Sequence, residues 1–187
     1  MRRILPGLLA SMLLAGCMST TPLFNGENLQ GWWTTGDAQW QAGNGQIVAR
    51  GDGDGYIASD SSYGDFLLSL EFWVDATTNS GVYIRCRDRA RIHPETCYEI
   101  NIWDDHPQPD ARTGSIVFKV MPPLAQVLTV GRWNRYEIVA RGARIEARVN
   151  GVLTAVLEDA DERAGFIALQ HAETGTVKFR NIQLTPL

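Results

Sequence analysis

The sequence predicts an all-β protein that folds as one domain, in the form of a sandwich or a barrel. From residue 23 on, no window of about 12 residues shows the apolar spacing of a helix. Short runs of alternating apolar and polar residues recur instead, and turn-forming residues separate them. The chain of 187 residues, 44% hydrophobic and 20% charged, has room for one well-filled core and hardly for two.

The predicted strands follow one another at short intervals. In chain order they are GQIVAR (45–50), FLLSLEFWV (66–74), GVYIRC (81–86), CYEINIW (97–103), GSIVFKV (114–120), NRYEIVAR (134–141), ARIEARVNG (143–151), VLTAVL (152–157), GFIALQ (165–170) and TVKFRNIQL (176–184). The steps RGAR and VNGV predict hairpin turns, because Gly and Asn tolerate a positive φ. The polar, proline-bearing stretch DDHPQPDART (104–113) is a loop of the kind that functional residues favour.

The N-terminus predicts export and lipid attachment. MRRILPGLLASMLLAGC has two arginines, a short apolar run and small residues before Cys17, which is the layout of a secretory signal. Its LAGC ending resembles the lipobox of bacterial lipoproteins, which are cut before the cysteine and acylated on it. We expect a signal peptide at 1–16, a lipidated tether at 17–22 and a folded domain at 23–187, anchored in the bacterial periplasm or outer membrane. The alternative is an ordinary signal peptide in which Cys17 is incidental.

With Cys17 acylated, Cys86 and Cys97 are the two remaining cysteines and can form a pair. They lie at the end of one predicted strand and the start of the next, so a hairpin brings them together. A disulfide there closes a loop of about a dozen residues and contributes about 3 kcal/mol in the chain-entropy model. Two buried free thiols are the alternative.

Charge and composition restrict the class of partner. The formal net charge is -4 and the sequence has no basic stripe, which argues against nucleic acid. The 6 tryptophans suit stacking surfaces for sugar rings. We expect a monomer that binds a carbohydrate.

Polar and aromatic side chains gather on one face of three predicted strands. With a period of two, that face holds Ser69, Glu71, Trp73, Tyr83, Arg85, Glu99, Asn101 and Trp103. Sugar rings stack on aromatic faces, and charged or amide groups fix their hydroxyls, so this pattern predicts a sugar-binding groove. The alternative is the solvated outer face of a sandwich.

The run EINIWD resembles E-x-D-x-x-E, the catalytic strand of laminarinase-like retaining glycosidases. Glu99 matches the first acid, Asn101 replaces the middle acid, and Asp104 would have to be the last. Retaining hydrolysis requires two carboxylates about 5 Å apart. The loss of the middle acid argues against that reaction, and a retaining endo-glycanase using Glu99 and Asp104 stays as an alternative.

Taken together, the motifs resemble those of the 3-keto-disaccharide hydrolase family, from about residue 23 to the C-terminus. They are LFNGENLQGW (23–32), NSGVYIR (79–85), CYEINIWDD (97–105), GRWNRYEIVARGARIEARVNG (131–151) and GFIALQHAETGTVKFRNIQL (165–184). The resemblance implies a two-sheet, concanavalin-like jelly-roll sandwich. It also implies cleavage of glycosides that are already oxidised to a ketone at carbon 3.

A ketone at carbon 3 acidifies the hydrogen on carbon 2, so a base can remove it and the enolate can expel the aglycone from carbon 1. The site needs a base, a stabiliser for the enolate oxygen and an acid for the leaving group. We assign Glu99 as the base, Arg85 or a bound metal as the stabiliser, and His171 or Glu71 as the acid. The second hypothesis for the whole domain is a non-catalytic carbohydrate-binding module.

The resemblance implies roles for Glu71, Arg85, Glu99, Asp104 and Gln170. Substrate binding is expected from Asn101, Trp103, Asp104, Gln170, Tyr83, Trp73 and Lys119. A divalent metal, calcium or a transition metal, could polarise the ketone at carbon 3 instead of a side chain. Its candidate ligands are Glu99, Asp104, Asp105, His106 and His171. No tight ligand spacing supports that set. His93 and His106 are expected to be surface residues.

Overall fold

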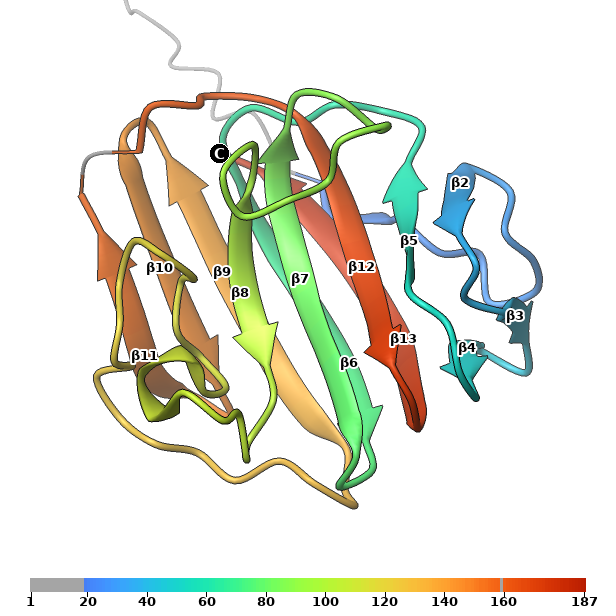
Figure 1. Ribbon diagram of the computed structural model, residues 1–187. Helices are drawn as coiled ribbons and strands as arrows, with labels where there is room; N and C mark the ends of the chain where they lie inside the picture. The colour runs from blue at the N-terminus through green and yellow to red at the C-terminus, as the bar shows by residue number, and fades with distance from the viewer. Residues whose placement is uncertain (1–18, 159) are drawn as a thin grey trace, which may run out of the picture.

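A computed structural model describes residues 19–158 and 160–187, and it is an all-β sandwich (Figure 1). The predicted signal peptide and Cys17 lie outside the described residues. In the described part of the chain, no helix is long and apolar enough to cross a membrane.

The strands are antiparallel, and among the described residues one 3-10 turn, Pro109–Ala111, interrupts the long loop after β8. Their bounds are β1 Thr21–Pro22, β2 Trp32–Gly36, β3 Trp40–Gly43, β4 Gln46–Arg50, β5 Gly55–Ser59, β6 Phe66–Val74, β7 Thr78–Cys86, β8 Tyr98–Ile102, β9 Asn134–Arg141, β10 Arg144–Val149, β11 Val152–Leu157, β12 Phe166–Glu173 and β13 Thr176–Pro186. The predicted strand 114–120 is wrong, because Ile116 and Val120 form only an isolated bridge around a turn.

Two sheets pack face to face. The 8-stranded sheet has the order β11-β10-β9-β6-β13-β4-β3, with β1 added on β13, and the 5-stranded sheet has the order β2-β5-β12-β7-β8. In Figure 1 the strands β5, β12, β7 and β8 lie in front of β6, β9 and β13. The predicted all-β sandwich is confirmed.

The main core lies between the sheets. Alternate residues of β6, among them Leu68, Leu70 and Phe72, are buried there against Val82 and Ile100 of the 5-stranded sheet. The alternation predicted for 66–74 is therefore correct. However, β6 belongs to one sheet and β7 and β8 to the other, so their polar faces point to opposite sides of the sandwich. The prediction of one polar face shared by the three strands is wrong.

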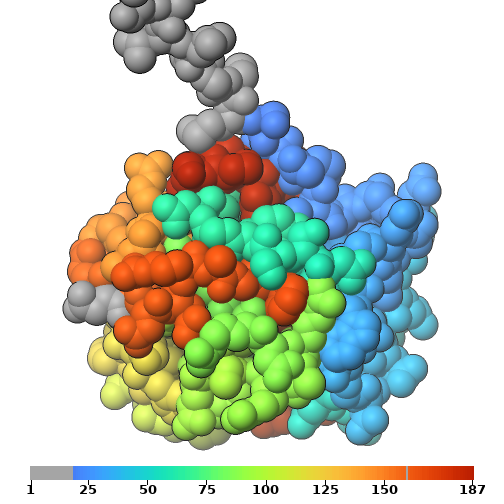
Figure 2. Space-filling view, turned by 90° about the horizontal axis from the view of Figure 1, so that it is seen from above, coloured from blue at the N-terminus to red at the C-terminus, as the bar shows by residue number. Residues whose placement is uncertain are grey.

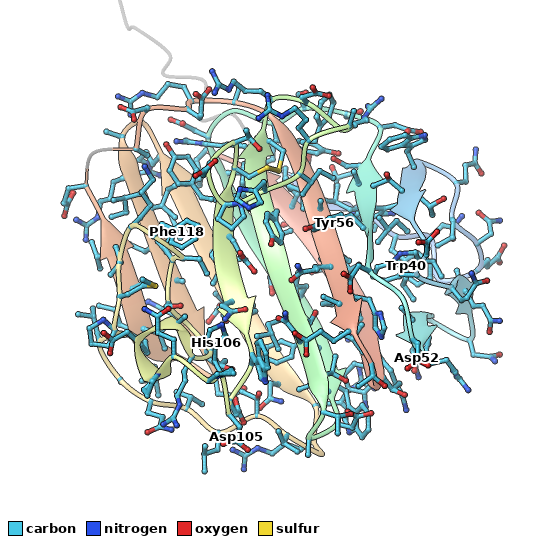
Figure 3. All side chains as sticks on the ribbon, viewed as in Figure 1. Trp40, Asp52, Tyr56, Asp105, His106 and Phe118 are labelled. Carbon is cyan, nitrogen blue, oxygen red and sulfur yellow. A yellow bond between two sulfur atoms is a disulfide. The ribbon has the colours of Figure 1, made fainter. Side chains whose placement is uncertain are left out.

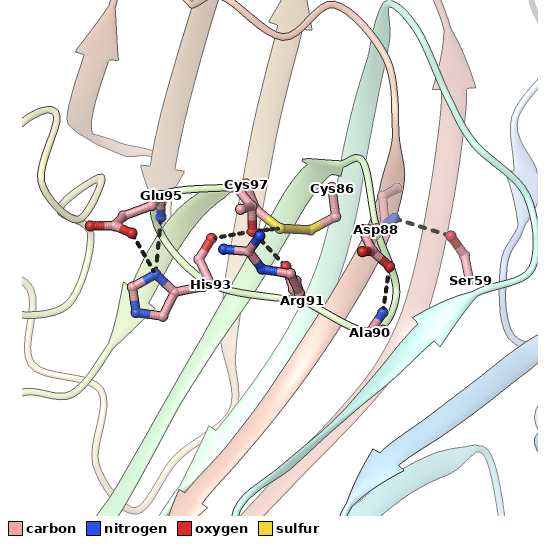
Figure 4. Close-up of a disulfide and its surroundings, with 10 residues drawn as sticks. Ser59, Cys86, Asp88, Ala90, Arg91, His93, Glu95 and Cys97 are labelled. Carbon is pink, nitrogen blue, oxygen red and sulfur yellow. Dashed lines mark hydrogen bonds and ion pairs between the residues drawn. A yellow bond between two sulfur atoms is a disulfide. The ribbon is translucent and has the colours of Figure 1, made fainter.

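A second, smaller apolar cluster lies on the outer face of the 5-stranded sheet, beneath the loop 87–97. Its buried members are Ala58, Tyr83, Cys86, Ile92, Cys97 and Ala168. The two cysteines that the sequence pairs form a disulfide, with their Cα atoms 4.4 Å apart, and this bond closes the loop (Figure 4). From above, the loop (green) lies beside the segment before β12 (orange) in Figure 2, where Arg87 and Glu162 form an ion pair of 3.2 Å.

Candidate active site

A groove on the outer face of the 5-stranded sheet gathers polar side chains from four strands and two loops. Its volume is about 230 Å³. The lining residues are Tyr56, Asn79, Tyr83, His93, Pro94, Glu99, Asn101, His106, Val117 and Gln170. In Figure 3, Tyr56 stands toward the β5 side of this face, and His106 and Phe118 stand on the opposite side, on the loop after β8.

The strand register builds the floor of the groove. Tyr83 of β7 pairs with Glu99 of β8, and Gly81 pairs with both Asn101 and Gln170. Neighbouring strands lie about 4.8 Å apart, so these side chains stand next to one another on one face. The sequence pattern therefore placed Tyr83, Glu99 and Asn101 on the same face correctly.

Glu99 is the acid of the groove. The residue is only 6% exposed. Burial raises the pKa of its carboxyl to about 7, although a hydrogen bond with the Tyr83 hydroxyl lowers it. A carboxyl with this pKa is present in both protonation states near neutral pH, which suits a group that accepts and returns a proton.

Gly81 makes room for this carboxylate. A Cβ at position 81 would lie 2.9 Å from Oε1 of Glu99 and 3.3 Å from Oε1 of Gln170. An isolated glycine in a strand often marks such a close approach. Oε1 of Gln170 is buried and has no hydrogen-bond partner among the described residues. It is thus an open acceptor beside the carboxylate.

Two histidines lie at the rim, where the sequence predicted only surface residues. Nδ1 of His106 lies 2.9 Å from the carbonyl oxygen and 3.0 Å from the backbone nitrogen of Gln108, and Nδ1 of His93 accepts the N–H of Glu95 at 3.3 Å. Nδ1 of each ring therefore faces the backbone, which leaves Nε2 for a ligand. The ring of Trp103 packs edge-to-face on His106, with centroids 4.5 Å apart, so Trp103 supports the rim.

Arg85 is not in the groove, and its assignment as the enolate stabiliser is wrong. Its φ of 54° breaks the alternation of β7. Its fully buried guanidinium donates to the carbonyl oxygens of Gly142 at 2.7 Å and Glu162 at 2.8 Å. It also pairs with Asp65, 3.1 Å away, just before β6. Arg85 therefore ties the two sheets together.

Glu71 and Trp73 lie on the outer face of the 8-stranded sheet, on the far side of the sandwich from Glu99. Glu71 accepts hydrogen bonds from Arg180 at 2.7 Å and Asn181 at 2.9 Å. Trp73 packs against the ammonium of Lys178. Their predicted roles in the groove are wrong.

His171 and Asp104 hold loops in place. His171 is fully buried, and its Nδ1 lies 2.8 Å from the carbonyl oxygen of Gly53. Asp104 accepts hydrogen bonds from the hydroxyls of Thr113 at 2.7 Å and Thr129 at 2.9 Å. Neither lines the groove, so the predicted roles of His171 as the acid and of Asp104 as a substrate contact or second carboxylate are wrong.

The remaining predicted substrate contacts divide between the groove and its surroundings. Gln170, Tyr83 and Asn101 line the groove, although the Asn101 amide also donates to the carbonyl oxygen of Ala111. Lys119 is exposed on the turn after Val117 and does not line it. Within 19–158 and 160–187, no three His, Cys, Asp or Glu side chains form a metal-binding group, so the five proposed ligands are not brought together.

Several solved structures with this fold are glycosyl hydrolase-like or carbohydrate-binding proteins. A candidate glycosyl hydrolase from Parabacteroides distasonis ATCC 8503 is 26% identical over 90% of this chain and all (100%) of its own, with a TM-score of 0.74. A second one from that organism is 22% identical, covers 90% and 94% of the two chains, and has a TM-score of 0.77. The carbohydrate-binding module CBM66 from Bacillus subtilis is 19% identical, covers 83% and 95%, and has a TM-score of 0.66.

The fold and the groove define a carbohydrate-active domain with a jelly-roll sandwich, which confirms the predicted fold class. Residues 19–185 match the model of the 3-keto-alpha-glucoside-1,2-lyase-like domain family, and the chain belongs to this family. No curated protein matches the chain in sequence.

Proposed function

We propose that the protein cleaves 3-keto-glycosides, 3-keto-disaccharides among them, by removing the proton on carbon 2, eliminating the aglycone and hydrating the product. One observation carries the proposal. Glu99 is a buried carboxyl with a pKa of about 7, and it is the only acid among the described residues that line the groove.

A single carboxylate suits elimination better than direct hydrolysis. Retaining and inverting glycosidases flank the scissile bond with two carboxyl groups. Glu71 lies on the other sheet, and Asp104 is engaged with Thr113 and Thr129. Elimination needs only one base, because the ketone itself makes the carbon 2 proton removable.

The proposed steps balance as follows. The Glu99 carboxylate takes the proton from carbon 2, and the enolate forms with its charge on the oxygen at carbon 3. The electron pair then returns, carbon 1 and carbon 2 become doubly bonded, and the bond from carbon 1 to the aglycone oxygen breaks. Water adds a hydroxyl to carbon 1 and a proton to carbon 2. We assign the rim histidines, His93 and His106, to donate a hydrogen bond from Nε2 to the enolate oxygen in place of Arg85.

The test uses a matched pair of disaccharides, one with the ketone at carbon 3 and one unoxidised, in deuterated water with and without a chelator. We expect cleavage of the keto sugar alone and one deuterium at carbon 2 of the product. Rapid cleavage of the unoxidised sugar would indicate a glycosidase, and binding without cleavage of either would indicate a carbohydrate-binding module. Loss of activity with the chelator would assign the polarisation of the ketone to a metal.

We also propose that the protein is exported and lipid-anchored through Cys17. The support is the signal-like composition of 1–16 and the LAGC ending. Acylation adds hydrocarbon that binds a membrane. The variant Cys17→Ser is expected to appear in the soluble fraction while the wild type sediments with membranes. Equal sedimentation of both would refute the anchor.

A further inference from the structure

The proposed elimination needs an acid for the departing oxygen, and neither of the two groups that the sequence suggested is available. Glu71 lies on the other sheet, and His171 is buried against Gly53. The groove instead contains two tyrosines next to the base, Tyr56 from β5 and Tyr83 from β7.

These tyrosines form a chain of neighbouring polar groups with Glu99. Their rings meet edge-to-face, with centroids 5.3 Å apart and an interplanar angle of 88°. The Tyr83 hydroxyl interacts with Glu99, its neighbour on β8, on one side and with the Tyr56 hydroxyl on the other. Nε2 of Gln170 donates to the Tyr56 hydroxyl at 3.4 Å. The chain thus runs from Gln170 through Tyr56 and Tyr83 to the base.

The number of protons in this chain sets its direction. A tyrosine hydroxyl has one proton to donate. While Glu99 is ionised it can only accept, so Tyr83 donates to Glu99. Since the only Tyr83 proton is then engaged with Glu99, Tyr56 is the donor in its contact with Tyr83. Once Glu99 has taken a proton it becomes a donor to Tyr83, and Tyr83 can turn its own proton toward Tyr56. The Tyr56 oxygen then accepts from Tyr83 and Gln170, which leaves the Tyr56 proton for the open groove.

We propose that Tyr56 is the general acid that protonates the departing aglycone oxygen, and that Tyr83 carries the replacement proton to it from Glu99. The inference rests on the proposed elimination. The proton on carbon 2 goes to Glu99, the Tyr56 proton goes to the leaving oxygen, Tyr83 reprotonates Tyr56, and Glu99 reprotonates Tyr83. No proton is gained or lost, and Glu99 is ionised again.

Burial supports this role for both rings. Loss of solvation raises the pKa of the Tyr56 hydroxyl and, more strongly, that of Tyr83. Both groups therefore keep their protons at neutral pH and are donors when the aglycone departs. A phenol is acidic enough to assist a sugar alkoxide, whereas a nitrophenolate departs without help.

The first test compares two 3-keto-glycosides of the same sugar, one a disaccharide and the other a p-nitrophenyl glycoside. The variant Tyr56→Phe keeps the ring and its packing, and its melting temperature is measured as the folding control. We expect Tyr56→Phe to slow cleavage of the disaccharide by about 100-fold or more and that of the nitrophenyl glycoside by only about threefold. Equal slowing of both would overturn the role of Tyr56. If His106→Gln slowed the disaccharide much more than the nitrophenyl glycoside and Tyr56→Phe did not, the general acid would be His106. That result would also overturn the role of Tyr56.

The second test follows the carbon 2 proton in deuterated water. If only the departure of the aglycone is impaired, the enolate returns to substrate, so Tyr56→Phe should accumulate unreacted disaccharide with deuterium at carbon 2. Glu99→Gln should leave the substrate unlabelled. An unlabelled substrate with Tyr56→Phe would overturn the proposal.

Tyr83→Phe tests the relay. This variant should slow the disaccharide more than the nitrophenyl glycoside, in comparison with the wild type. If the ratio of the two rates stayed at its wild-type value, Tyr83 would not carry the replacement proton. The wild type separates the two proposals. If it cleaves neither keto substrate, the proposed function fails, whereas cleavage of both with a uniform effect of Tyr56→Phe refutes only the inference about Tyr56.

Discussion

The two outer faces of the sandwich carry similar residues and differ in what covers them. Each has a glutamate on a strand with aromatic and amide side chains nearby. Glu99 is 6% exposed and unpaired with any cation among the described residues, whereas the side chain of Glu71 is 29% exposed and pairs with Arg180. Burial raises the pKa of Glu71, but hydrogen bonds from Asn181 and Arg180 outweigh it and hold that pKa below its usual value.

The difference comes from the loops. The disulfide-closed loop 87–97 and the long loop after β8 rise beside Glu99 and remove water from it, and they supply His93 and His106. The 8-stranded sheet has an open, solvated surface around Glu71. A strand pattern alone thus offers two candidate carboxylates, and the covering loops decide which of them is suited to take a proton.

The largest expected effect is on turnover of a 3-keto-disaccharide. Glu99→Gln keeps the shape but cannot accept a proton, so the rate should fall by about 100- to 10,000-fold. The matched change Glu71→Gln on the exposed face should leave the rate within about twofold of the wild type. The measurement is the initial rate of each variant, with its melting temperature as the control for folding. Comparable losses in the two variants would break the comparison between the faces.

A smaller loss is expected from crowding the carboxylate. In Gly81→Ala the new Cβ would meet Oε1 of Glu99 at 2.9 Å, so the carboxylate must move. A displacement of about 1 Å in a catalytic group costs about 100-fold in rate. Gly64→Ala is the control, because its Cβ would lie 3.9 Å from its nearest neighbour, the carbonyl oxygen of Arg163. Full activity in Gly81→Ala would show that Glu99 need not be held in place.

The pH profile follows from the state of Glu99. The base must be ionised, so kcat/KM for the keto sugar should rise about tenfold per pH unit below a pKa of about 7 and level off above it. An inflection near pH 4.5, the ordinary value for a glutamate, would mean that the groove does not desolvate the carboxyl.

The last expected effect is on stability. Glu99 has a pKa of about 7 in the folded protein and 4.5 ordinarily, so between these values the folded state binds the proton more tightly than the unfolded chain. Stability should therefore fall as the pH rises from about 4.5 to about 7, by up to about 3 kcal/mol. Glu99→Gln has no such charge and should melt higher than the wild type at pH 8 and similarly at pH 4. Denaturation at the two pH values measures the difference, and a lower melting temperature at pH 8 would contradict it.

The sequence predicted the two faces of individual strands well, because alternation is local. It correctly placed the apolar residues of β6 inside, and Tyr83, Glu99 and Asn101 together outside. It could not predict which sheet each strand joins, because β6 pairs with β9 and β13, which lie far along the chain. Glu71 was misplaced for that reason.

Other errors come from positions where alternation stops. The positive φ of Arg85 turns its side chain away from the face that the pattern predicts. His93 is exposed, as predicted, but alternation cannot place it or His106 at the groove because both lie in loops, which have no period. The short strand that carries Tyr56 begins at the end of GDGDG, which was interpreted as a turn. One signal was present and unused. Gly81, the one residue of β7 without a side chain, marks the place where the Glu99 carboxylate lies close to the β7 backbone.

The Cys86–Cys97 bond has a consequence for where the protein can work. It closes the loop that carries Ile92 over Tyr83 and sets His93 at the rim, so the walls of the groove depend on a cystine. Thiol pools keep cysteines reduced in a cytosol, and cystines persist in oxidising compartments. In a reducing compartment the loop over Glu99 would thus not be closed by a disulfide. The walls of the groove would form fully only after the chain had entered an oxidising compartment.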